Sequence, residues 1–250
     1  MIYLIFLLGL FIGSFLNVCI YRIPKGKSIA YPPSHCPKCG ENLRPWDLIP
    51  ILSFISTKGK CRYCEEAISL QYPIIELFNG LIYLLLYLKY GLTIVFVKYA
   101  ILASLLLIIS IIDYKIQIIP DGCNLFGLIG SGIFVVLSGF DYSSWIDAGL
   151  GLFVGGGIFL FIAIATNGAM GGGDIKLMGV LGFAFGWKYI LLISLLSFII
   201  GSIISIFLLL FKLKHRKDPI AFGPFISIAA FMTMLYGNEM IHWYILNIIR

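Results

Sequence analysis

The sequence predicts an all-α polytopic membrane protein with about eight transmembrane helices and one small cysteine-bearing loop module. Three observations predict this class. Of the 250 residues, 60% are hydrophobic and only 12% are charged, about half the charged share of an ordinary soluble domain. Mean hydropathy is +1.00. The apolar residues are gathered into long runs, and most lysines and arginines lie between alternate runs. A soluble core could not bury this much apolar sequence, so we expect a lipid bilayer as the surroundings.

The N-terminal segment, Met1–Gly9, lacks the basic n-region of a cleaved signal peptide, so it is interpreted as a retained first span. A span needs about 20 apolar residues, or fewer where part of it lies in the interface. The sixth candidate is short and interrupted by glycine. The predicted spans are Ile2–Ile20, Ile74–Leu88, Leu92–Ile112, Asn124–Ser138, Trp145–Thr166, Ile175–Phe185, Tyr189–Phe211 and Ile220–Tyr236.

Basic residues predict the orientation. They concentrate in the loop Tyr21–Pro73 and in the run Lys212–Lys217, with single lysines at Lys115 and Lys176. If eight spans alternate, all of these lie on one side, which is the cytoplasmic side. The N-terminus is then outside. The net charge of +6 is explained by this orientation, so we expect no nucleic-acid partner.

Two acids have an unusual setting. Asp113 ends an apolar run, and Asp174 follows Gly171-Gly172-Gly173 between two apolar runs. The predicted topology places both at the cytoplasmic boundary of the membrane. Acids in apolar spans are costly, which makes them functional candidates. Three consecutive glycines let a backbone bend and approach another surface closely. We therefore expect Asp113 and Asp174 to form a catalytic pair; the alternative is that each acid merely ends a helix.

The other polar residues near the spans have simpler interpretations. Asp121 follows Pro120, where helix N-capping is its natural role. Glu76 could complement a helix dipole or hold a polar partner. Lys176 lies two residues beyond Asp174 and cannot face it on a helix, so it is interpreted as an anchor at the lipid interface.

Cysteines define the loop module. Cys36, Cys39, Cys61 and Cys64 form the pattern C-x2-C-x21-C-x2-C, the usual spacing of a zinc ribbon. The alternative is disulfides, which are rare in a cytoplasmic loop. We therefore predict a small cytoplasmic zinc-ribbon-like module with structural zinc, or another soft metal, bound by these four thiolates. A metal would organise a loop that is too small to bury a large core.

Together these motifs resemble the type IV prepilin peptidases, the bifunctional leader peptidase/N-methyltransferases of bacterial membranes. Gly171-x-Gly173-Asp174 is the G-x-G-D signature that this family shares with presenilin-like intramembrane aspartic proteases. The motifs that carry the resemblance are Gly13–Val18 with Arg22 and Pro24, the two cysteine pairs, Pro45–Pro50, Tyr72-Pro73 with Glu76, Asp113 with Ile119–Asp121, and Gly171–Asp174 with Lys176.

The resemblance implies the function. The acids at positions 113 and 174 would be catalytic, one ionised and one protonated, as two adjacent carboxyls favour. The substrate would be a type IV prepilin or pseudopilin, cut after a Gly where a basic leader meets an apolar helix. The family also methylates the new N-terminal residue with S-adenosylmethionine, which we assign to the N-terminal half with its cysteine module (residues 1–90). The aspartic peptidase part is residues 91–250, in the bacterial inner (cytoplasmic) membrane.

Two other function classes fit parts of the sequence. An ion- or proton-coupled transporter could use paired membrane acids, but both acids lie at one boundary, and no inverted repeat is evident. A non-enzymatic, zinc-bearing membrane scaffold explains the cysteines and leaves the triple glycine and the second acid unexplained.

Overall fold

The computed structural model describes residues 1–137, 139, 142–168, 170–215 and 218–249. Within these ranges the chain is helical, and extended structure is limited to two isolated bridges, His35–Asn42 and Lys60–Ala67. The all-α prediction is therefore confirmed for the described residues. Ser138, the predicted end of the fourth span, lies outside the described residues, as do Ala169 in the glycine-rich stretch and Arg216, Lys217 and Arg250.

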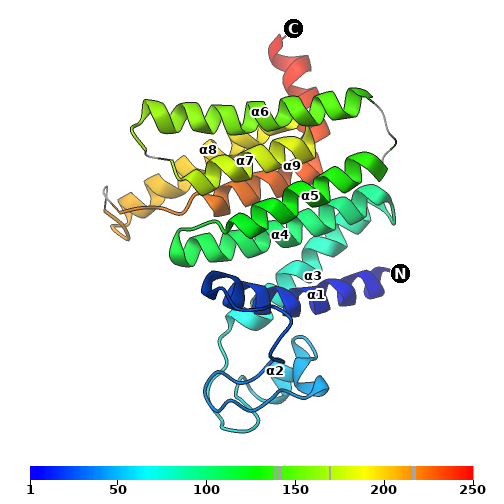
Figure 1. The fold of residues 1–250 in the computed structure, drawn as a ribbon, viewed down its shortest axis with the longest axis vertical. Helices are drawn as coiled ribbons and strands as arrows, with labels where there is room; N and C mark the ends of the chain where they lie inside the picture. The colour runs from blue at the N-terminus through cyan, green and yellow to red at the C-terminus, as the bar shows by residue number, and fades with distance from the viewer. Residues whose placement is uncertain (138, 140–141, 169, 216–217, 250) are drawn as a thin grey trace. The chain divides into compact units, whose positions relative to one another are not determined.

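In chain order the helices are α1 (Ile2–Arg22), η1 (Ile23–Lys25), η2 (Pro45–Leu48), α2 (Leu52–Ser56), α3 (Gln71–Tyr90), α4 (Ile94–Ile116), α5 (Asp121–Leu137), α6 (Tyr142–Ala165), α7 (Gly172–Phe185), α8 (Trp187–Leu210), α9 (Gly223–Tyr244) and η3 (Ile245–Ile249), as labelled in Figure 1. The eight long helices, α1 and α3 to α9, lie where the apolar runs predicted them, whereas the short helices η1, η2, α2 and η3 were not predicted.

Length and composition qualify five of these helices as membrane spans: α1, α3, α4, α6 and α8. The helix α5 is apolar but has only 17 residues, and α7 has 14. Each of the eight predicted spans thus has a helix, but the described residues establish an integral membrane protein with at least five candidate spans rather than a count of eight.

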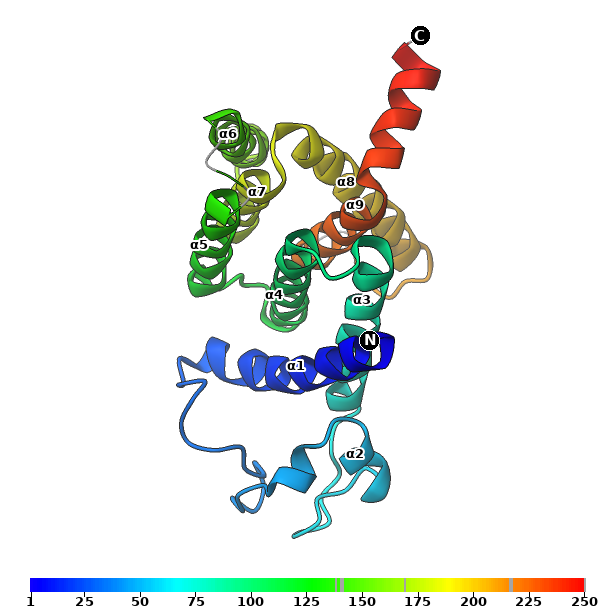
Figure 2. The same ribbon diagram turned by 90° about the vertical axis from the view of Figure 1, so that its right-hand side faces the viewer.

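The chain divides into two compact units, Met1–Ile108 and Ile109–Arg250, with the boundary inside α4. In the first unit α1 packs against α3 (Figure 2). Small residues bring the two backbones together, since a Cβ at Gly9 would lie 2.8 Å from the Cα of Gly80. Asn79 of α3 donates to the carbonyl of Gly9 at 2.7 Å. The functional division predicted at residue 90 stays a prediction.

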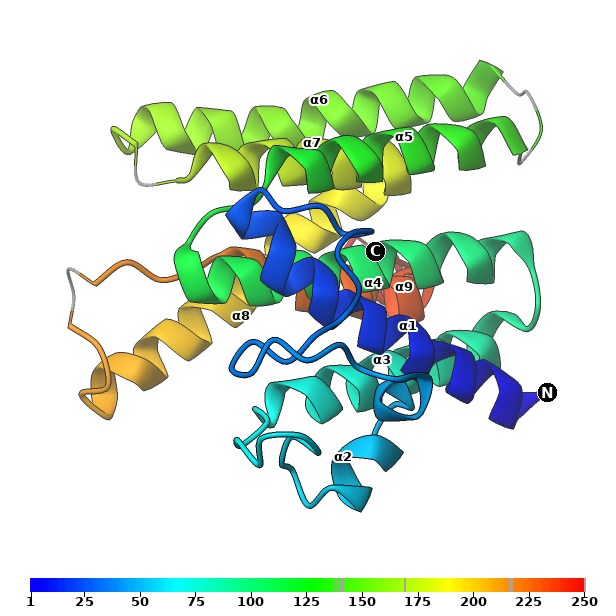
Figure 3. The ribbon, with the colours of Figure 1, turned by 60° about the horizontal axis from the view of Figure 1, so that its bottom comes forward.

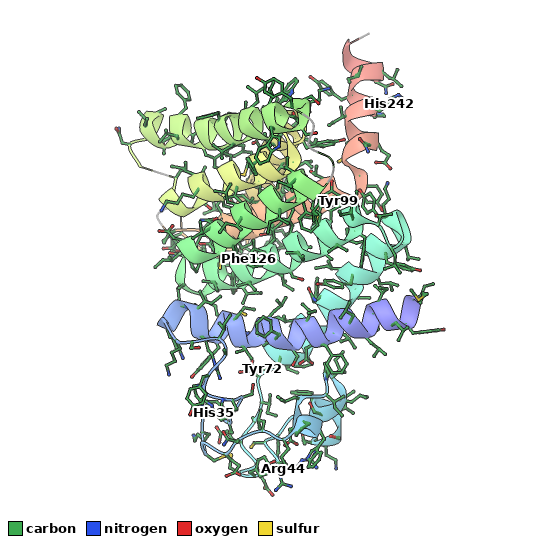
Figure 4. All side chains as sticks on the ribbon, turned by 45° about the vertical axis from the view of Figure 1, so that its right-hand side comes forward. His35, Arg44, Tyr72, Tyr99, Phe126 and His242 are labelled. Carbon is green, nitrogen blue, oxygen red and sulfur yellow. The ribbon has the colours of Figure 1, made fainter. Side chains whose placement is uncertain are left out.

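The cysteine loop connects α1 to α3. Arg22, at the end of α1, fixes its first part: the buried guanidinium donates to the carbonyls of Ser28, Pro32 and Pro33 at 3.0, 2.7 and 3.3 Å. Figure 4 labels His35 and Arg44 within the loop and Tyr72 where the loop meets α3.

In the second unit α7 packs against α5, α6 and α8, and Figure 3 shows α5, α6 and α7 side by side. Glycines again permit the approach. A Cβ at Gly151 of α6 would meet the backbone carbonyl of Gly182 on α7, and a Cβ at Gly155 would meet that of Met178. This packing fixes α7, whose first turn carries Asp174.

Candidate active site and metal centre

Asp113 lies in the last turn of α4 and is 5% exposed. Its Oδ2 accepts a hydrogen bond of 2.8 Å from the backbone N–H of Gly223, the first residue of α9. The N-terminus of a helix carries a partial positive charge, which favours a carboxylate over a carboxylic acid at this position. The contact with Gly223 therefore stabilises the charged form of Asp113 and offsets part of the cost of burying it.

Gly223 fits this contact closely. A Cβ at this position would lie 2.8 Å from the Oδ2 of Asp113 and 3.2 Å from its Cγ. Sequence analysis did not identify Gly223. The pair Gly223-Pro224 could have indicated the start of α9 in the sequence. Proline is favoured in the first turn of a helix, where its missing N–H costs nothing.

Asp174 lies in the first turn of α7, and its backbone N–H donates to the carbonyl of Gly171 at 3.1 Å. Its Oδ1 is buried and has no hydrogen-bond partner among the described residues. The two carboxyl groups are close enough for the charge of Asp113 to act on Asp174. The structure thus brings the two predicted acids together within the second unit.

The triple glycine explains part of this approach. A Cβ at Gly173 would lie 2.9 Å from the Cβ of Ile119, so α7 can begin beside the segment before α5 only with glycine there. The bend itself lies just upstream, where Asn167 and Gly168 have φ of +52° and +91°. The close approach of the glycine segment to another part of the chain was predicted correctly. The sharp turn, however, lies at Asn167 and Gly168 rather than in the three glycines.

Lys176 and Asp121 differ from their predicted roles. Asp121 is inside the first turn of α5, and its Oδ1 pairs with the Nζ of Lys176 at 2.7 Å. Sequence reasoning correctly separated Lys176 from Asp174 but gave it no acid partner, because the neighbouring helix start was not visible in the pattern. Both side chains are exposed, so the pair contributes little to stability.

The four predicted cysteines form a cluster in the loop. Their Sγ atoms all lie within 4.8 Å of one another, and those of Cys36 and Cys64 are 3.9 Å apart. Tetrahedral coordination with Zn–S bonds of about 2.3 Å places sulfurs about 3.8 Å apart, so the cluster fits zinc. All six cysteines of the chain are free thiols, as the zinc interpretation requires.

The two cysteine pairs have the same local fold. The N–H of Gly40 donates to the carbonyl of Cys36 at 2.9 Å, and that of Glu65 donates to Cys61 at 3.0 Å. The residue after each second cysteine has a left-handed backbone, with φ of +73° at Gly40 and +58° at Glu65. Each pair is thus a tight turn that presents two sulfurs.

The hydrogen bonds of the cluster favour the thiolate at Cys36. At Cys64 a backbone hydrogen bond from Glu66 acts to lower the pKa, but burial and the hydrogen bonds with the neighbouring thiols outweigh it and raise the pKa to about 12. Burial acts to raise the pKa of Cys36, but hydrogen bonds from the backbone of Cys39 and Lys38 and from neighbouring thiols outweigh it and lower the pKa to about 7. A lower pKa favours the thiolate, which is the form that binds metal.

Asp47 lies between the two cysteine pairs and binds the two residues enclosed by the second pair. Its carboxylate accepts hydrogen bonds from Arg62 at 2.9 Å and Tyr63 at 2.8 Å. Burial acts to raise the pKa of Asp47, but the bonds from Tyr63, the backbone of Arg44 and Arg62 lower it below its usual value. Asp47 therefore stays charged and stabilises the module at neutral pH.

Two family models match most of the chain. Residues 7–90 match the bacterial peptidase A24 N-terminal domain, and residues 100–206 match the type IV leader peptidase family. A "Prepilin leader peptidase/N-methyltransferase" of Bacillus subtilis (strain 168) is 35% identical over 98% of this chain and 98% of its own length. The chain belongs to the type IV leader peptidase family.

Other relatives in the family carry the same name. The protein of Pseudomonas aeruginosa is 33% identical over 96% of this chain and 91% of its own, and that of Pseudomonas putida is 31% identical over 93% and 90%. No solved structure gives a significant match. The first matched segment contains the four clustered cysteines and the second contains both aspartates, so the predicted family resemblance is confirmed. The relatives' names give no support to a transporter.

Proposed function

We propose that this chain removes the leader peptide from type IV prepilins or pseudopilins, with Asp113 and Asp174 as the catalytic pair, and then methylates the new N-terminus. The proposal rests on the proximity of two carboxyls, one at the C-terminal end of α4 and one at the N-terminal end of α7. Relatives in the family are named for this activity. The proposed topology keeps the N-terminus outside, the two acids at the cytoplasmic boundary and eight helices across the membrane.

The contacts of the two acids suggest their roles. Asp113 accepts the N–H of Gly223 at the start of α9, which favours its ionised form, so it acts as the base. Asp174 has a buried oxygen without a partner, which favours its protonated form, so it acts as the acid. One residue of each kind is what hydrolysis by two carboxyls requires.

The reaction then follows from these roles. Asp113 takes a proton from water as the water oxygen attacks the scissile carbonyl carbon. Asp174 gives its proton to the carbonyl oxygen. When the tetrahedral intermediate collapses, the C–N bond breaks and the proton on Asp113 passes to the leaving amine, while one hydroxyl of the intermediate returns its proton to Asp174 and becomes the new carbonyl oxygen. The products are the leader with a new carboxylate and a pilin with a free amine.

The cysteine cluster would hold zinc in a structural role. Four thiolates close the coordination shell and leave no position for a substrate or water. The methyl donor would be S-adenosylmethionine, which supplies an electrophilic methyl group. Its place in residues 1–90 rests on the family resemblance.

The test uses full-length protein in detergent with an uncut prepilin peptide. Asp113→Asn and Asp174→Asn should each lower the cleavage rate by a factor of about 100 or more, since each removes one side of acid–base catalysis. Asp218→Asn is the matched control, because this carboxylate is exposed and its hydrogen bond among the described residues comes from the N–H of His215. Normal cleavage by either active-site variant would refute the assignment.

A further inference from the structure

The first unit contains a buried acid that the proposed peptidase reaction does not use. Glu76 lies in the second turn of α3 and is 7% exposed. Its Oε2 accepts the backbone N–H of Ile51 at 2.8 Å, and the Ser14 hydroxyl of α1 is close enough to stabilise its carboxylate. Glu76 is too far along the helix to complement its dipole, so its polar contacts explain its position better.

Ile51 is held in a costly conformation to make this contact. Its φ of +60° and ψ of −49° lie where a β-branched residue is a genuine outlier. Such strain persists where surrounding structure imposes it, most often at functional sites. Here the strained backbone points its N–H at the carboxylate of Glu76.

The helix α1 closes the other side of this carboxylate. A Cβ at Gly13 would lie 2.7 Å from the Cα of Glu76, so α1 lies directly against α3 here. One turn along α1, buried Asn17 donates to the carbonyls of Gly13 and Tyr72 at 3.3 and 3.2 Å. The surroundings of Glu76 are polar, but these neighbours are neutral.

A compensating cation is missing from the described contacts of Glu76. Within the described residues its carboxylate takes part in no salt bridge. The buried Arg22 of α1 gives its N–H groups to backbone carbonyls instead. A buried carboxylate with only neutral partners is unfavourable, and a cationic ligand would offset that cost.

The geometry limits which cation fits. A divalent metal prefers several oxygen or thiolate ligands, and Glu76 is a single carboxylate. A guanidinium binds best to both oxygens of a carboxylate, but Oε2 already accepts the N–H of Ile51. A primary ammonium is a compact point charge and needs only the remaining oxygen.

We propose that Glu76 binds the α-ammonium of the newly cut substrate and accepts one of its protons. This inference rests on the proposed function, because leader cleavage supplies that amine. The N–H bond breaks, the proton moves to Glu76, and the electron pair stays on nitrogen. The free amine can then attack a methyl sulfonium donor: an N–C bond forms, and the C–S bond breaks with its electron pair leaving on sulfur. Glu76 is thus a catalytic residue of methylation and separate from the peptidase pair.

Binding measurements test the ammonium directly. Full-length protein in lipid nanodiscs is titrated with a lysine-free peptide that begins with Phe, carries a C-terminal fluorophore, and has either a free or an acetylated N-terminus. The wild type should prefer the free amine by about tenfold or more, as a charged hydrogen bond allows. Glu76→Gln should bind both peptides equally. Glu41→Gln, an exposed acid of the same unit, should keep the wild-type preference.

The ratio of the two affinities is measured on the folded fraction of one sample, so partial misfolding does not change it. If Glu76→Gln does not fold, Glu76→Asp replaces it. That variant keeps the charge but moves it back by one methylene, so its preference should fall without vanishing. Cleavage of an uncut prepilin peptide, followed in parallel, reports on the proposed function itself. Failure to cleave would count against that function, whereas the amine preference tests Glu76 alone.

Three results would overturn the proposal. In the first, Glu76→Gln keeps the preference for the free amine. In the second, Glu76→Gln loses affinity for S-adenosylmethionine in the absence of peptide, which would assign the carboxylate to the methyl donor's own ammonium. In the third, the variant loses affinity for an uncut peptide with a leader lysine but not for the cut one, which would assign Glu76 to the leader.

Discussion

At the scale of single residues, the N–H of Gly223 holds the carboxylate of the proposed base, Asp113. Gly223→Ala would place a Cβ 2.8 Å from the Oδ2 of Asp113 and displace either the carboxylate or the start of α9. We expect kcat for leader cleavage to fall by a factor of about 100, as when one donor to a developing charge is removed, with a smaller change in KM. Gly157→Ala is the control, because its Cβ would meet no atom within 4 Å. Equal kcat values for both variants would exclude a role for this contact.

The two cysteine turns allow a paired test of the metal site. Glu65 has a left-handed backbone where the first turn has Gly40, and a side chain there costs about 1–2 kcal/mol. Glu65→Gly should therefore slow zinc release to a chelator several-fold, whereas Gly40→Ala should speed it. Metal analysis should give about one ion per chain in both variants. Identical release rates would show that these turns do not limit metal binding.

Single residues also show what sequence could predict. Asp113 and Asp174 were identifiable because an acid among apolar residues is unusual wherever the chain folds. Gly223 was not, since its meaning depends on a partner 110 residues away. Glu76 was noticed, but its partner Ile51 lies in a loop with no periodicity to place it.

At the scale of elements, the packing of α6 on α7 positions Asp174. Gly151→Ala would push a methyl group into the backbone of Gly182, so we expect a loss of about 1–3 kcal/mol of stability and slower cleavage. Thermal unfolding in detergent and a cleavage assay measure the two effects. Gly149→Ala on the same helix should be tolerated, because its Cβ meets no atom within 4 Å. If the two variants behave alike, close approach is not what holds α7.

Apolar runs located each of the eight long helices, α1 and α3 to α9, but not their ends. The helix α3 begins at Gln71, before the apolar run, and α4 continues to Ile116, beyond it. Polar residues continue a helix wherever they can reach water, so hydropathy underestimates its length. Glycines made α7 look doubtful as a span, yet it is a regular helix whose glycines serve its packing.

At the scale of the whole molecule, the two proposed activities use residues from different compact units. An Asp113→Asn/Asp174→Asn double variant should therefore still methylate a pilin that is already cut and begins with Phe. Mass spectrometry after incubation with S-adenosylmethionine would detect the gain of one methyl group on the N-terminus. A double variant that inserts normally but methylates nothing would show that the acids do more than cut.

Family membership was predictable at this scale because the motifs are spread over nearly the whole chain, and residues 7–90 and 100–206 both match. The number of spans was not, because α5 and α7 are shorter than a bilayer requires and α9 is not among the candidate spans. A helix packed on protein at most of its sides needs less apolar surface than one facing lipid, so hydropathy does not settle its position.

Zinc bound to the cysteine cluster would join residues 28 positions apart, such as Cys36 and Cys64, through an ion rather than a covalent bond. The stability that such a crosslink adds depends on the free concentration of the ion. For a ligand that binds only the folded module, each tenfold fall in that concentration removes about 1.4 kcal/mol of stability. Zinc starvation would therefore loosen the loop that holds Ile51 against Glu76. Pilin methylation would then depend on the zinc nutrition of the cell, whereas the aspartate pair requires no metal.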